Sequence, residues 1–150
     1  MKRPDRVITY VGFDNPDLVP MVEVLVARIA PFIPPWVDRL TVGCQPTEAM
    51  SGSTARVYVQ QEYRRLDIQL SETFFFQPEN ERMDTITHEF VAHGLLGPIH
   101  CTIENFMRLL LPADPDDPQC KVFHEMWRTA LESTTQDITS IVLRQLRPEC

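Results

Sequence analysis

The chain has little positive charge and no dense basic segment. Its 150 residues include 14 lysines and arginines against 21 aspartates and glutamates, which gives a net charge of −7. Nucleic-acid binding requires clustered basic side chains opposite the phosphates, so the composition argues against nucleic acid as a direct partner. Carboxylates and neutral imidazoles are metal ligands, and an acidic chain of this kind can therefore hold a cation.

The sequence also lacks an apolar run long enough to cross a bilayer. Its most apolar stretch, residues 18–33, is interrupted by Pro20 and Pro31 and carries Glu23 and Arg28. A membrane-spanning helix needs about 20 consecutive apolar residues. The first residues likewise contain no apolar segment of the length that a signal peptide requires. We therefore expect a cytoplasmic protein without a membrane partner.

Cysteine is scarce and scattered. The four thiols, at Cys44, Cys101, Cys120 and Cys150, form no Cys-x-x-Cys pair. Without an export signal, free thiols are expected rather than two disulfides. A structural zinc site built on cysteine is disfavoured for the same reason.

Only five glycines but thirteen prolines punctuate the chain, and they delimit the expected elements. We predict one α+β domain over residues 1–150, with a small, mainly antiparallel or mixed sheet packed on helices. The alternating pattern of residues 55–63 and 66–70 predicts a β-hairpin. The other expected strands are 7–11 and 39–44, and the expected helices are 18–30, 79–96, 99–111 and 121–146, with Gly97-Pro98 ending the second helix.

Apolar residues recur at helical spacing in the last two of these helices. We expect the helix over 99–111 to pack through Ile103, Phe106, Met107 and Leu110. The final helix carries a similar stripe at Phe123, Trp127, Ala130, Thr134, Ile138 and Ile141.

Histidine is concentrated in one place. Three of the four histidines, His88, His93 and His100, fall within thirteen residues, and Glu89 directly follows the first. Two histidines on successive turns of one helix face can bind zinc, while a glutamate beside the first reaches the water that the metal activates. The segment therefore predicts a zinc site on a helix, with His88 and His93 as ligands and Glu89 as general base.

The spacing of this segment, HEFVAH, is one residue longer than the common HExxH motif. Residues five apart on an ideal α-helix are separated by about 140° around the axis, against about 40° for residues four apart. A π-bulge in this turn would bring His88 and His93 back onto one face, and such bulges are frequent at functional sites. We therefore predict an irregular turn between the two histidines.

HEFVAH resembles the HExxGH motif of the dipeptidyl peptidase III family, with Ala92 in the glycine position. The wider context is similar to zincins of the gluzincin type, and especially to small metallopeptidase-like proteins of phage genomes. That resemblance covers roughly residues 36–98. It comprises a Trp-Val lead into a strand, a Tyr-Arg hairpin with an I-x-L strand, the His-Glu helix, and the run His93-Gly94-Leu95-Leu96-Gly97-Pro98.

The resemblance implies a minimal zincin-like fold and a zinc-dependent peptidase that acts on a peptide or protein. An extended substrate would pair with an edge strand, either 55–63 or 66–70. Gluzincins take their third ligand from a later helix, which favours Glu132, with Asp137 placed to orient one histidine. The alternative third ligands are Glu125, His124, His100 and Glu104.

Two other interpretations of the sequence stand beside the peptidase. The first is a zincin-like domain that binds metal or a protein partner with weak catalysis or none, which the stretched spacing of HEFVAH favours. The second is a globular interaction domain without metal. A peptidase would also need a donor for the developing oxyanion, for which Tyr58, Tyr63 and Arg64 are candidates.

Overall fold

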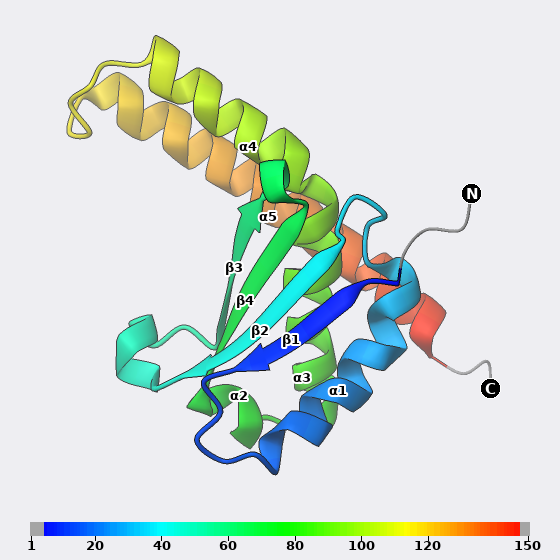
Figure 1. The fold of residues 1–150 in the computed structure, drawn as a ribbon. Coiled ribbons are helices and arrows are strands. Elements are labelled where there is room, and N and C mark those ends of the chain that lie inside the picture. Colours follow the sequence, from blue (N-terminus) through cyan, green and yellow to red (C-terminus); the bar gives the residue numbers. More distant parts are fainter. Residues whose placement is uncertain (1–4, 148–150) are drawn as a thin grey trace.

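A computed structural model describes residues 5–147, and its centre is a sheet of four strands (Figure 1). The strands are β1 (Val7–Val11), β2 (Arg39–Gln45), β3 (Ala55–Gln60) and β4 (Arg65–Ser71), and they lie in the order β1-β2-β4-β3. The sheet and the helices packed on it confirm the α+β class. Cys44, Cys101 and Cys120 are free thiols, and Cys150 lies outside the described residues.

The sheet is mixed, but it is not mainly antiparallel. β1 pairs with β2 and β2 pairs with β4 in parallel, and only β3 and β4 are antiparallel. The parallel pairing of β1 and β2 follows from α1 (Leu18–Ile29), which carries the chain back between them. The predicted hairpin is confirmed as β3 and β4, with Val57 opposite Ile68. β3 is the edge strand, whereas β4 is internal.

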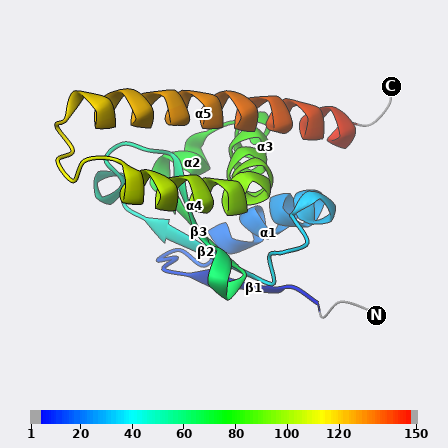
Figure 2. The same ribbon diagram turned by 90° about the horizontal axis from the view of Figure 1, so that it is seen from above.

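The helices cover one face of the sheet (Figure 2). Leu66, Ile68 and Leu70 of β4 are fully buried against them, as the alternating pattern predicted. From α1, the buried side chains Val22, Leu25, Val26 and Ile29 join the same core. Phe74 of the short α2 (Glu72–Phe76) closes this core next to the end of β4.

The histidine segment lies within one long helical run rather than in a helix that ends at Gly97-Pro98. The run comprises α3 (Glu79–Ile86), the π-helical turn η4 (Thr87–Ala92) and α4 (His93–Leu110). Pro98 has no N–H to donate to the carbonyl of Gly94 four residues earlier. The indole Nε1 of Trp36 donates to that carbonyl instead, at 2.9 Å. The predicted helix end at Gly97-Pro98 is therefore wrong, because a distant side chain satisfies the group that proline leaves unpaired.

The helix α5 (Pro118–Leu146) returns antiparallel to α4, and Figure 1 shows the far end of this helical hairpin extending beyond the sheet. The Asp117 side chain caps α5 by accepting a hydrogen bond from the Gln119 N–H at 2.8 Å. None of the helices within residues 5–147 is both long and apolar enough to cross a membrane.

The predicted packing of the last two helices is only partly correct. Of the four apolar residues expected to pack from α4, Met107 is buried, whereas Phe106 and Leu110 are 56% and 78% exposed. The buried face of α5 instead consists of Cys120, Leu131, Thr135, Thr139 and Val142. The far end of the hairpin therefore leaves apolar side chains uncovered, because it extends past the sheet that would bury them.

Candidate metal centre

The π-helical turn η4 brings His88 and His93 onto one face, as the five-residue spacing predicted. The backbone N–H of His93 donates to the carbonyl of His88, which is the i to i+5 hydrogen bond of a π-helix. The Nε2 atoms of the two imidazoles lie 3.1 Å apart, with the rings edge to face. The extra residue in HEFVAH is thus accommodated by a local widening of the helix.

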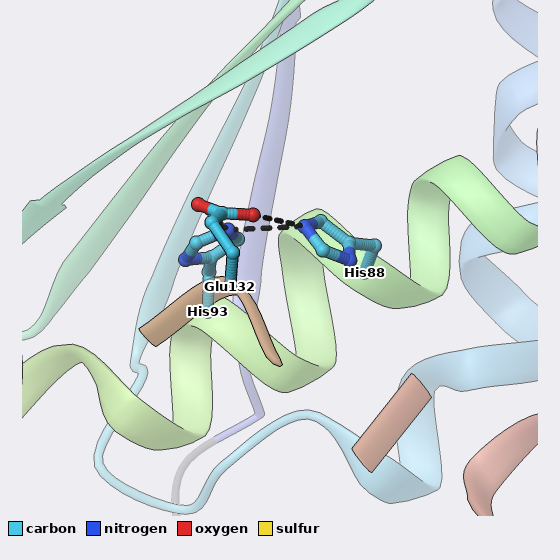
Figure 3. A group of neighbouring side chains, drawn as sticks. All are labelled: His88, His93 and Glu132. Atoms are coloured by element: carbon cyan, nitrogen blue, oxygen red, sulfur yellow. Dashed lines mark hydrogen bonds and ion pairs between the residues drawn. The ribbon is translucent and has the colours of Figure 1, made fainter. Parts of the chain in front are cut away.

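Glu132 of α5 reaches the same point from the neighbouring helix (Figure 3). Its Oε2 lies 3.5 Å from Nε2 of His88, and its Oε1 lies 3.7 Å from Nε2 of His93. Within residues 5–147, these three side chains are the one group of potential metal ligands whose ligand atoms all lie within 4.8 Å of one another. The structure therefore brings together the two histidines and the glutamate that the sequence favoured.

The distances between these ligand atoms fit a zinc ion. A tetrahedral zinc ion with nitrogen and oxygen ligands at about 2.0–2.1 Å separates its ligands by roughly 3.3–3.4 Å. The three observed separations, 3.1, 3.5 and 3.7 Å, lie on both sides of that value. Two imidazoles and one carboxylate also match the donor set of catalytic zinc sites, in which a fourth position stays open for water or substrate.

The electrostatics of His93 suit a metal ligand. The side chain is buried, and its burial, together with the nearby His88 and His100, lowers its pKa from 6.5 to about 4. At neutral pH the imidazole is therefore uncharged and keeps a free lone pair.

Glu89 lies on the same π-helical turn, and the pKa of its carboxyl group is raised. Burial first, and the charge of Glu132 second, raise the pKa of Glu89 from 4.5 to about 7. A carboxyl group with a pKa close to neutral can both accept and return a proton during a reaction. This is the acidity that a general base needs at neutral pH.

A cleft of about 1180 Å³ opens beside these residues. One wall is the edge strand β3, of which every residue lines the cleft, and the other wall comes from α4 and α5. Glu89, His93 and Glu132 all line this cleft, which places the candidate metal ligands next to an unpaired strand edge. Of the two strands that the sequence left open as substrate platform, β3 is the one at the edge.

The other candidate ligands lie along the cleft but outside the ligand cluster. His100 is bonded to Glu104, with 2.7 Å between Nε2 and Oε1. His124 and Glu125 line the cleft from α5. None of these four joins His88 and His93 in a group with ligand atoms within 4.8 Å among the described residues.

Three further residues occupy positions relevant to their predicted roles. Asp137 is exposed on α5 and, within the described part of the chain, forms no hydrogen bond or ion pair with His88 or His93, so its orienting role stays a prediction. Tyr58 lines the cleft. Arg64, in the turn between β3 and β4, instead pairs with Asp38, which directly precedes β2.

Sequence reasoning missed several residues of the cleft wall, namely Cys101, Lys121, Trp127 and Arg128. Trp127 packs near His100, with ring centroids 6.0 Å apart, although it was expected only as part of an apolar stripe. The sequence spacing could have predicted that Lys121 and Arg128 lie on the same helix face as Glu132. Lys121, Arg128 and Glu132 follow one another at intervals of seven and four residues, which places them on one face of α5.

Comparison with known proteins adds no relative, since no protein-family model, no curated protein and no solved structure matches the chain. The function is therefore argued from the residues of the site. The similarity to zincins rests on the sequence motifs alone.

Proposed function

We propose that this protein is a zinc-dependent peptidase of the zincin type, with His88, His93 and Glu132 as the metal ligands. The observation that carries the proposal is the convergence of these three side chains, from one π-helical turn and a separate helix, at separations that suit zinc. Glu89 beside the cluster, with its pKa near 7, supplies the general base.

Bound zinc would lower the pKa of a water molecule and polarise the carbonyl of the peptide bond to be cleaved. The chain's own residues handle the proton. The Glu89 carboxylate accepts a proton from the attacking water and then donates it to the departing amine. A pKa near 7 serves both steps, because the carboxylate and the carboxylic acid are then close in free energy at neutral pH.

The substrate class follows from the edge strand. β3 has a strand partner on one side only, so its other edge can pair with an extended peptide through backbone N–H and C=O groups. The Cys101 thiol donates to one carbonyl of this strand, that of Val59, at 3.9 Å. Because every residue of β3 lines the cleft, a peptide paired there would pass the metal ligands and Glu89. An extended segment of a peptide or protein is therefore the substrate that this arrangement supports.

Metal analysis combined with cleavage of a peptide library tests the proposal. We expect about one zinc per chain in the purified protein and in the Glu89→Gln variant, and none in His93→Ala. Glu89→Gln should lower the cleavage rate by about 10²–10⁴-fold, the usual contribution of a general base. Glu125→Gln, a change at another glutamate that lines the cleft, is the matched control and should leave both zinc and cleavage intact.

The outcomes separate the alternatives. Absence of zinc from the wild-type protein would overturn the proposal. Zinc that depends on His88 and His93, combined with no cleavage of any library peptide, would instead indicate the metal-binding domain without hydrolysis.

A further inference from the structure

The hairpin of α4 and α5 exposes a concentrated apolar surface that has no role in the metal centre. Phe106, Leu110 and Met126 are 56%, 78% and 65% exposed. We name this surface the hairpin face and define it by six exposed residues near the hairpin's far end: Phe106, Leu109, Leu110, Val122, Phe123 and Met126.

A groove of about 480 Å³ runs between the two helices on this surface. It is lined by apolar side chains of both helices, with Gln119 as its one polar residue and no charged residue. The residues of α4 that line the cleft, such as His100, are six positions away from those of the hairpin face, such as Phe106. Six residues correspond to about 120° around the helix axis, so the groove and the cleft open on different sides of α4. On α5, Trp127 lies between them and lines both.

The residues along this side of both helices, apolar except for Gln119, follow the spacing of a helix bundle. On α4 they are Ile99, Ile103, Phe106 and Leu110, at intervals of four, three and four residues. The α5 positions Gln119, Phe123, Met126 and Ala130 repeat the same intervals. Alternating steps of three and four place side chains along one seam, the pattern by which helices pack in four-helix bundles.

We propose that the hairpin face binds a second copy of this chain, so that two hairpins form a four-helix bundle in a twofold dimer. Two antiparallel helices with the same spacing present a self-complementary surface, as a twofold interface requires. The proposal does not depend on zinc or on peptidase activity.

The exposed area of the hairpin face is sufficient for such a dimer. With about 150–200 Å² for a fully exposed residue of this size, the exposed fractions of its six residues amount to roughly 570–760 Å² per copy, at the lower end of the standard range. Stable interfaces of standard size bury about 800 Å² per partner. The hairpin also extends beyond the sheet (Figure 1), which leaves its far end open to a partner.

The charge distribution favours a second copy over a lipid surface. Peripheral membrane helices carry lysines and arginines beside their apolar face. Here Lys121 and Arg128 line the cleft, and Arg108 lines a second hollow next to β3. No charged residue lines the groove, so two hairpin faces meet without charge repulsion at their centre.

Sedimentation analysis of the full chain tests the dimer. We expect the wild-type protein to sediment at twice the single-chain mass of 17.3 kDa. Phe106→Glu and Met126→Glu, one on each helix, should each reduce the measured mass to that of one chain. Val24→Glu is the matched control, because Val24 on α1 is 62% exposed but lies outside the hairpin, and it should remain dimeric.

Circular dichroism and zinc content, measured on the same samples, should be unchanged in all three variants. A wild-type protein that remains a single chain at about 100 µM would overturn the proposal, because interfaces of this area bind with micromolar affinity or better. Binding of that single chain to lipid vesicles would assign the surface to a membrane instead. A dimer that persists in both Phe106→Glu and Met126→Glu would equally overturn it.

Discussion

Replacement of Glu132 by alanine separates the metal contribution of this residue from its contribution to the fold. The Glu132 side chain is 52% exposed, and its carboxylate oxygens lie 3.5 and 3.7 Å from the two imidazoles. Exposed ion pairs of this kind contribute about 0–1 kcal/mol. Glu132→Ala should therefore change the free energy of unfolding by less than about 1 kcal/mol when a chelator is present.

With zinc the expected difference is much larger. A ligand present at 1,000 times its dissociation constant stabilises the folded state by about 4 kcal/mol. For a chain of this length, 1 kcal/mol shifts the melting temperature by about 2–4 °C, so zinc should raise the melting temperature of the wild-type protein by about 8–16 °C. Glu132→Ala should lose most of this increase, because two imidazoles alone leave the ion without its third protein ligand.

Thermal unfolding followed by circular dichroism, with zinc and with chelator, measures this difference. Glu125→Ala is the matched control on the same helix, since Glu125 is exposed, lines the cleft and was an alternative third ligand. It should retain the full zinc-dependent increase. Equal increases in wild type and Glu132→Ala, or loss of the increase in Glu125→Ala, would refute the assignment of the third ligand.

Three further predictions follow from the histidine helix. Deletion of Ala92 places the two histidines four residues apart and should close the π-helical turn, so that metal analysis still finds bound zinc. Trp36→Phe leaves the Gly94 carbonyl without its donor and should lower the free energy of unfolding in urea by about 1–3 kcal/mol. The third prediction concerns the metal-free Glu89→Gln variant. In its unfolded chain, His93 binds a proton near pH 6.5, whereas in the folded protein His93 binds a proton only near pH 4. Stability should therefore fall by up to about 1.4 kcal/mol per pH unit as the pH is lowered between these values. In wild type, the raised pKa of Glu89 opposes this slope.

Local patterns in the sequence were sufficient for the strands and for the π-helical turn. The alternation of Leu66, Ile68 and Leu70 predicted a strand with one buried face, which the fully buried side chains confirm. The spacing of His88 and His93 predicted an irregular turn, because only a widened helix places them on one face. Both predictions needed only a few neighbouring residues.

The features that the sequence did not reveal depend on contacts between distant segments. The helix continues through Pro98 because Trp36, 58 residues away from Gly94, donates to the Gly94 carbonyl that Pro98 leaves without a helical partner. Helical periodicity also does not decide whether Glu125 or Glu132 is the third candidate ligand. Seven residues bring them within about 20° of the same face, and only their separation of about 10 Å along the helix decides which one reaches the histidines. That axial position is determined by how α5 packs against η4.

Core packing holds the candidate metal ligands in place. Within the six-residue π-helical turn, Thr87, Phe90, Val91 and Ala92 are buried, whereas Glu89 lines the cleft. His88 lies beside His93 and Glu132 (Figure 3). The Thr87 hydroxyl also donates to the Met83 carbonyl at 2.7 Å, which secures the start of the turn. A rotation of this turn that separated the histidines would also withdraw the fully buried Phe90 from the core, at a cost of roughly 1.5–3 kcal/mol. The packing of this turn therefore positions Glu89, whose pKa its own burial raises, together with the two histidines.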